Sequence, residues 1–148
     1  SAFILNLGLE TLALRMEKHC ANALAVAKCL SEHECGEWVD YPLLEGNSQY
    51  DLACKYLPTG ACGVISVGIK GGRAAACRFL DSLKLLNIVG HVADARSCAL
   101  HPASTTHRQL TSQELINCGI SEDLIRLSVG IEHVDDIIED LAKALENA

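Results

Sequence analysis

The chain has 148 residues, of which 49% are hydrophobic and 21% charged, and this composition is typical of one soluble globular domain. Its formal net charge of −7 disfavours the phosphate backbone of a nucleic acid as a partner. No stretch has the roughly 20 consecutive apolar residues of a membrane-spanning helix, and the first residues lack the basic start of a secretory signal. We therefore expect a cytoplasmic protein without membrane or nucleic-acid partners.

Eight cysteines and six histidines raise the question of disulfides or a metal site. No cysteine pair has the Cys-x-x-Cys spacing, and the gaps fit neither a zinc ribbon nor a redox motif. His101 and His107 flank a loop that contains Pro102, so we expect hydroxyl-to-backbone bonds rather than a metal to hold this loop. We predict no bound metal, and reduced, mostly buried thiols that pack as small hydrophobic side chains. The cysteines in Ala-rich or apolar surroundings are Cys20, Cys29, Cys54, Cys62, Cys77 and Cys98.

The first predicted element is one long helix over residues 5–31, ending near residues 31–33. Its apolar residues recur at spacings of three and four, which places them on a single stripe. No proline or glycine interrupts the helical pattern after Gly8. The residues of the stripe are Leu9, Leu12, Met16, Cys20, Ala23, Ala27 and Leu30.

The rest of the chain is predicted to alternate between short strands and helices. The strands are expected at residues 38–41, where Pro42 ends the first, and at 63–69, 87–92, 97–100 and 124–131. The helices are expected at 49–57, 73–83, 111–118 and 134–145, and Thr111 with Glu114 predicts a capping box. Several strands are separated by less than a full crossover connection, which favours an antiparallel or mixed sheet. The expected fold class is therefore α/β or α+β, with a mostly antiparallel sheet covered by helices in a single domain of residues 1–148.

The strand at residues 124–131 contains the candidate binding residue Arg126. Alternation places Ile125, Leu127, Val129 and Ile131 on an apolar face. Arg126 shares the opposite face with Ser128 and Gly130. A guanidinium among small residues suits paired hydrogen bonds to a carboxylate, with room for a ligand to approach. Surface and salt-bridging arginines are more frequent, so this pattern alone leaves the role open.

Five short segments together resemble one enzyme family. Leu-His-Pro-Ala-Ser-Thr-Thr-His occupies residues 100–107, and Arg-Leu-Ser-Val-Gly-Ile-Glu occupies residues 126–132. Further similar segments lie at residues 8–16, 69–85 and 94–102. They are in the order found in the pyridoxal-phosphate enzymes of cysteine and methionine metabolism, and they look most like the sulfhydrylases of that family that act on O-acetylhomoserine.

The resemblance implies a fold, a complete enzyme and a cofactor. The implied fold is the small C-terminal domain of the aspartate-aminotransferase-like (fold type I) enzymes, with residues 1–33 as a long helix that connects it to a large domain. The implied complete enzyme is a cytoplasmic homotetramer in which pyridoxal phosphate promotes the replacement of acetate by sulfide or a thiol on O-acetylhomoserine.

The resemblance also assigns two substrate-binding residues. Arg126 occupies the position of the arginine that binds the substrate α-carboxylate, and Ser97 that of a serine near this carboxylate and the cofactor lysine. Cystathionine lyases and synthases of the family usually have a Gly-Gly pair and a glutamate before this serine. Here the preceding residues 93–96 are Ala-Asp-Ala-Arg, which favours a sulfhydrylase. A cystathionine-type enzyme remains the alternative.

The chain lacks the sequence features that hold the cofactor in this family. Pyridoxal phosphate requires a lysine for its Schiff base, and no lysine here has the Ser-x-Thr-Lys setting that these enzymes use. We therefore expect no catalytic residue and no bound cofactor in this chain, a cofactor-binding domain preceding Ser1, and inactivity of this piece alone. A non-catalytic domain for binding or oligomerisation is the second alternative.

Overall fold

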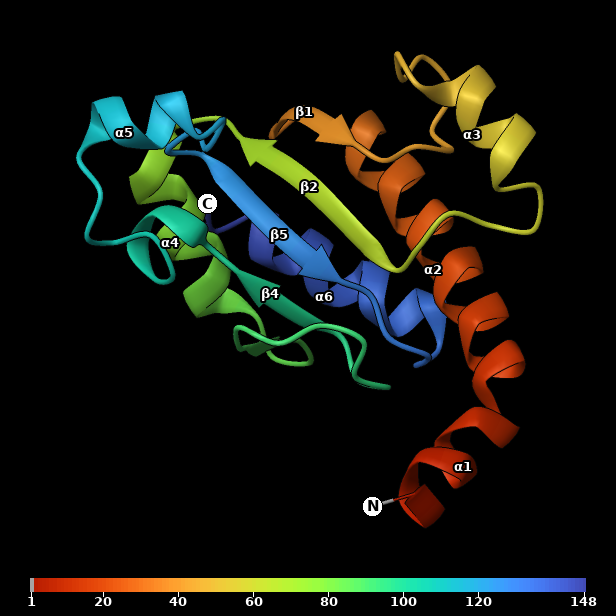
Figure 1. Ribbon diagram of the computed structural model, residues 1–148. Helices are drawn as coiled ribbons and strands as arrows, with labels where there is room; N and C mark the ends of the chain where they lie inside the picture. Colours follow the sequence, from red (N-terminus) through yellow and green to blue (C-terminus); the bar gives the residue numbers. More distant parts are fainter. Residues whose placement is uncertain (1) are drawn as a thin grey trace.

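A five-stranded sheet organises the chain in the computed structural model, which describes residues 2–148. The strands are β1 (Gly36–Asp40), β2 (Val64–Ile69), β3 (Asn87–Ile88), β4 (Cys98–Leu100) and β5 (Leu124–Ser128), in the order β1-β2-β5-β4-β3. Every neighbouring pair is antiparallel except β3 and β4, which are parallel (Figure 1). The predicted fold class, a mostly antiparallel sheet combined with helices, is confirmed.

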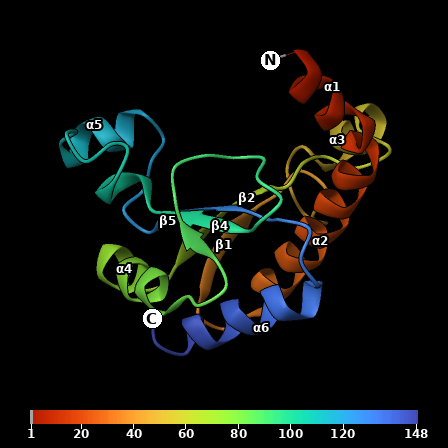
Figure 2. The ribbon, with the colours of Figure 1, turned by 90° about the horizontal axis from the view of Figure 1, so that it is seen from below.

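Three helices cover one face of this sheet. They are α2 (Leu12–Glu32), α4 (Gly72–Ser82) and α6 (Val134–Leu145), and Figure 2 shows them as a layer beneath the strands. The core lies between the two layers because alternate residues of β2 and β5 point toward the helices. Burying each aliphatic side chain of this kind contributes about 1.5–3 kcal/mol. Core residues with at most 2% exposure include Ile65, Val67, Ile69, Phe79, Ile125, Leu127, Ile137 and Leu141.

Short helices occupy the edges of the molecule. These are α1 (Ala2–Glu10), α3 (Tyr50–Tyr56), α5 (Ser112–Asn117) and the 3-10 turn η1 (Pro102–Ser104). The capping box of α5 is confirmed, because the Thr111 and Glu114 side chains each bond the other residue's backbone N–H. Among residues 2–148, no helix combines the length and the apolar character needed to cross a membrane.

The long N-terminal helix is divided at Thr11, contrary to the single helix predicted from the apolar stripe. Thr11 has φ −109° and ψ 7°, outside helical geometry, and the Arg15 guanidinium donates to the Gly8 carbonyl that a continuous helix would use internally. In α2 the stripe is buried only from Ala23 onward. The earlier stripe residue Leu9 is 64% exposed, because α1 extends away from the sheet (Figure 1).

Two strands are shorter than the sequence predicts. β5 ends at Ser128 rather than residue 131. The Val129 N–H still follows the register with β2 and donates to the Gly63 carbonyl, but the next N–H, that of Gly130, leaves the ladder and donates to the Ser97 hydroxyl. β3 ends at Ile88 rather than residue 92, and residues 89–97 form a loop over the face opposite the helices (Figure 2).

All eight cysteines are free thiols, but the prediction that most are buried is wrong. Only Cys98 is buried, whereas Cys54 and Cys118 are exposed on short surface helices or their ends. Burial raises the pKa of the Cys98 thiol, which keeps it protonated and unreactive at neutral pH.

Thiol titration tests this arrangement. We expect all eight thiols to react in the unfolded protein, with Cys54 and Cys118 reacting fastest and Cys98 slowest in the native state. A native disulfide, seen as two thiols that react only after reduction, would contradict the expectation.

Candidate functional site

The sheet face opposite the helices contains Arg126, as the alternation in β5 predicts. Ile125 and Leu127 are buried in the core, and Arg126 points the other way. The strand register places Arg126 between Ser66 of β2 and Leu100 of β4. A central strand thus holds the arginine rigidly in the middle of the face that the helices leave open.

The Arg126 guanidinium is half-buried and only partly hydrogen-bonded. Its Nη2 donates to the carbonyl oxygens of Gly90 at 3.0 Å and His91 at 3.2 Å. Its Nε is shielded from solvent and donates to no atom within residues 2–148. A buried donor without an acceptor costs about 1–3 kcal/mol. A carboxylate is one acceptor that would satisfy this orphaned donor.

The loop of residues 89–97 places the two carbonyls beside Arg126. His91 and Arg96 both bond the Asp94 carboxylate. The backbone N–H of Arg96 is the largest of several contacts that lower the pKa of Asp94 to about 2. Ala93 has φ 65°, a left-handed conformation that L-residues other than glycine rarely adopt. The loop is therefore a tight, internally bonded turn.

Ser97 lies at the end of this loop and is fully buried. Its hydroxyl donates to Glu132 Oε2 at 2.9 Å and accepts from the Gly130 N–H at 2.8 Å. Its backbone N–H donates to Glu132 Oε1 at 2.6 Å. The structure thus directs the predicted substrate-binding serine toward Glu132, and its described hydrogen bonds do not include Arg126.

Gly130 does not leave space for a ligand, contrary to the interpretation of its position beside Arg126. A Cβ at Gly130 would lie 2.2 Å from Glu132 Oε2 and 2.6 Å from the Ser97 backbone nitrogen. The absence of a side chain therefore permits the close approach of Glu132 and Ser97.

Sequence reasoning missed three polar residues that support this region. Two of them are Asn22 and His19 of α2, which are 2% and 4% exposed and hydrogen-bond to backbone carbonyls of residues 129–132. The third is Glu132, whose carboxylate accepts from the Ser97 N–H. Glu132 belongs to the motif at residues 126–132, but its partner is distant in sequence. The signal that marks Asn22 and His19 is polarity on the otherwise apolar inner face of a helix.

The histidine-containing loop is held by hydrogen bonds, as predicted. His101 Nε2 donates to the Glu122 carbonyl at 2.8 Å, so its Nδ1 accepts from the Ser104 hydroxyl. The Thr105 hydroxyl donates to the His101 carbonyl at 2.8 Å. Within residues 2–148, no three His, Cys, Asp or Glu side chains form a group that could hold a metal ion.

The residues present do not fit the anchor of pyridoxal phosphate. A Schiff-base lysine reacts readily when burial lowers its pKa. Every lysine of this chain is exposed: Lys18, Lys28, Lys55, Lys70, Lys84 and Lys143. The lysines of this chain therefore do not fit the covalent attachment of the cofactor.

Comparison with known proteins identifies the family. The model of the Cys/Met metabolism PLP-dependent enzymes matches residues 1–146, and the chain belongs to this family. It is 50% identical over 146 residues to a homocysteine synthase of Schizosaccharomyces pombe, covering 99% of this chain and 34% of that protein. It is 48% identical over 141 residues to an O-acetyl-L-homoserine sulfhydrylase of Leptospira meyeri, covering 95% of this chain and 32% of that protein.

A solved structure shows the same fold. It is the 2.35 Å crystal structure of a putative O-acetylhomoserine (thiol)-lyase from Campylobacter jejuni that contains N'-pyridoxyl-lysine-5'-monophosphate. The TM-score is 0.92 at 42% sequence identity, over 98% of this chain and 34% of that one. The chain therefore spans about a third of the length of the relatives it matches.

Proposed function

We propose that this chain is the small C-terminal, substrate-binding domain of a pyridoxal-phosphate enzyme that makes homocysteine from O-acetylhomoserine and sulfide. The observation that carries the proposal is the Arg126 guanidinium, which is fixed on the open face with an unpaired buried Nε. Family membership supports the cofactor, and the names of the two relatives support the reaction.

Arg126 binds the α-carboxylate of the amino-acid substrate in this proposal. Two backbone carbonyls hold Nη2, so the guanidinium is already oriented when the substrate arrives. Charge-assisted bonds from the remaining donors, Nε and Nη1, hold a carboxylate beside this fixed guanidinium. The reacting carbons are thereby held in one orientation, which lowers the entropic part of the barrier. Pyridoxal phosphate supplies an electron sink when bound, and the residues that anchor it would belong to the part of the enzyme outside this chain.

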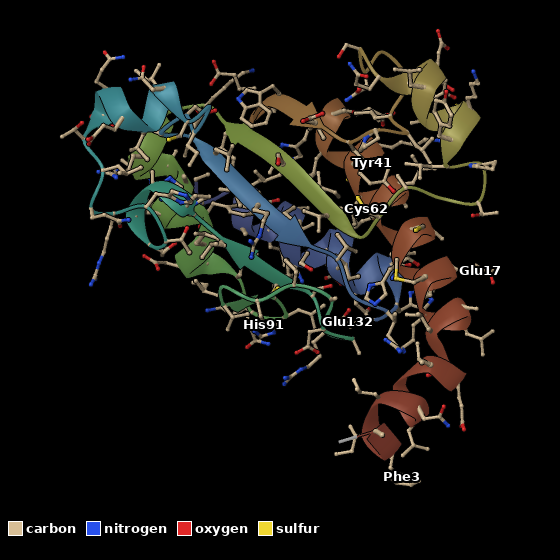
Figure 3. All side chains as sticks on the ribbon, in the orientation of Figure 1. Phe3, Glu17, Tyr41, Cys62, His91 and Glu132 are labelled. Carbon is tan, nitrogen blue, oxygen red and sulfur yellow. The ribbon has the colours of Figure 1, made fainter. Side chains whose placement is uncertain are left out.

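Residues 1–33 form the connection to that part of the enzyme in this proposal. The apolar side chains of α1 are exposed: Phe3 is 73% and Ile4 72% exposed. Figure 3 shows Phe3 at the far end of this helix, away from the sheet. No residue of α1 is buried against the rest of residues 2–148. Exposed apolar groups of this density mark a surface that another part of a protein covers.

Product analysis of the complete enzyme tests the proposed reaction. We expect homocysteine from O-acetylhomoserine and sulfide. The alternative is an enzyme of the cystathionine γ-synthase or γ-lyase type, which would form cystathionine with cysteine or cleave it. If cystathionine is formed or cleaved and sulfide is not used, the sulfhydrylase proposal is wrong.

The 148-residue chain alone is expected to be non-catalytic and to form no stoichiometric Schiff base with pyridoxal phosphate. All its lysines are exposed, and protonated surface amines are poor nucleophiles at neutral pH. The test is the absorbance near about 420 nm with equimolar cofactor, followed by borohydride reduction and mass spectrometry. One pyridoxyl group on a single lysine of every chain would overturn this expectation.

A further inference from the structure

Hydrogen bonds join the segment after β5 to the end of the loop 89–97. Glu132 accepts from both the N–H and the hydroxyl of Ser97. In the same region, the Gly130 N–H donates to the Ser97 hydroxyl and the Ile131 N–H donates to the Ala95 carbonyl at 2.8 Å. Glu132 contributes the only charged group to this junction among the described residues, and charge-assisted bonds are the stronger ones.

The loop anchored at this junction is the one that holds Arg126. Its Gly90 and His91 carbonyls accept from Arg126 Nη2, and the Cys98 thiol also bonds the His91 carbonyl at 3.6 Å. The other end of the loop is tied by the Val89 N–H to the Ala99 carbonyl at 3.2 Å. The loop is therefore fixed at both ends, and Glu132 fixes the end at Ser97. Figure 3 shows Glu132 and His91 along the same edge of the sheet.

Two side chains of helix α2 hold the backbone of the segment that contains Glu132. Asn22 Nδ2 donates to the Gly130 carbonyl at 3.0 Å and to the Glu132 carbonyl at 2.9 Å. His19 Nδ1 donates to the Val129 carbonyl at 2.6 Å, which fixes the ring tautomer. With its backbone held in this way, the Glu132 side chain turns toward Ser97 rather than toward solvent.

We propose that Glu132 is a positioning residue for recognition of the substrate carboxylate. It fixes Ser97 and the loop 89–97, and the loop carbonyls in turn set the orientation of Arg126. The inference rests on the proposed function of Arg126. Its physical basis is that a long side chain loses rotamer freedom on binding, and that cost falls when the free protein already holds the bound orientation.

A double-mutant cycle in the complete enzyme tests the proposal. We expect Glu132→Ala to raise the KM for O-acetylhomoserine about tenfold, with a smaller change in kcat, because ground-state orientation is lost. In an Arg126→Ala background, the same change should alter kcat/KM by less than about twofold. The reason is that Glu132 acts on the substrate only through the orientation of Arg126. Glu132→Gln, which keeps one acceptor, should give an intermediate KM. The control is Glu139→Ala on the exposed side of α6, which should leave the kinetics unchanged.

The outcomes separate this inference from the proposed function. If Arg126→Ala alone leaves kcat/KM normal, the proposed function fails, and this inference fails with it. If Arg126→Ala impairs the enzyme but Glu132→Ala has no effect or a fully additive one, only the inference is overturned. If Glu132→Ala does not fold, Glu132→Gln takes its place in the cycle, where the same non-additivity is required.

Hydrogen exchange gives a second readout that does not depend on activity. Glu132→Ala should speed exchange of the backbone amides in residues 89–97 about tenfold or more, because one anchor of the loop is removed. Glu139→Ala should leave that exchange unchanged. Unchanged exchange in Glu132→Ala would overturn the proposal, because Glu132 would then not hold the loop.

Discussion

Replacement of Arg126 by Ala in the complete enzyme is expected to lower kcat/KM for the amino-acid substrate by roughly 30-fold or more. The change leaves the substrate carboxylate unpaired in a partly dry site, which costs about 2–5 kcal/mol in comparable buried pairs, and about 1.36 kcal/mol corresponds to a factor of ten in rate. Arg126→Lys should recover little, because an ammonium does not present the planar fork of a guanidinium. Steady-state kinetics with each variant measures the effect.

Two controls make the Arg126 result specific. Cofactor absorbance and the melting temperature should be retained, because the core side of β5 is formed by Ile125 and Leu127, and the lysines of this chain do not fit the cofactor anchor. Arg108→Ala, at an exposed position outside the site, should leave kcat/KM unchanged. Near-normal kcat/KM in a well-folded Arg126→Ala enzyme would remove Arg126 from the substrate site and weaken the proposed function.

Replacement of Asp140 by Ala is expected to destabilise the domain by about 2–4 kcal/mol. The Asp140 carboxylate, 9% exposed on α6, accepts the backbone N–H groups of Lys84 and Leu85 at 2.9 Å and of Leu86 at 3.2 Å. These residues form the turn between α4 and β3. Removing the carboxylate leaves three backbone donors, of which that of Leu86 belongs to a buried residue, without this acceptor, and it releases the turn from α6.

Thermal unfolding of the 148-residue chain measures the Asp140 effect. A loss of this size should lower Tm by roughly 6–16 °C for a domain of this length. Asp140→Asn keeps one acceptor oxygen and should lose less. Asp136→Ala, an exposed carboxylate of the same helix, is the matched control and should cost less than about 1 kcal/mol. An equal Tm for Asp140→Ala and Asp136→Ala would show that the three bonds contribute little.

The element types and the core faces could be predicted from local sequence, and the reason is periodicity. Strand alternation correctly placed Ile125, Leu127 and Val129 in the core and Arg126 opposite them. The capping box at Thr111 was equally visible, because both of its partners lie within one turn. The break at Thr11 was not visible, since no proline or glycine occupies that position and long-range contacts bury the stripe only from Ala23 onward.

Arg126 could be singled out as a candidate site residue, because the alternation of β5 and the motif around it both point to it. What surrounds Arg126 could not be predicted. The carbonyls that bond it lie 35 and 36 residues earlier in the chain, in a loop where a longer strand was expected. The absence of a side chain at Gly130 suggested space for a ligand, whereas that space accommodates Glu132 and Ser97.

The sequence by itself determined the fold class, the family and the identity of the carboxylate-binding candidate, because these follow from periodicity and short motifs. Only the tertiary structure decided that Ser97 faces Glu132 and that α2 supports the segment 129–132. His19 and Asn22 are 108–110 residues from the carbonyls they bind. No local pattern specifies such pairs, because each polar group finds its partner only after the packing of helix on sheet has removed it from water.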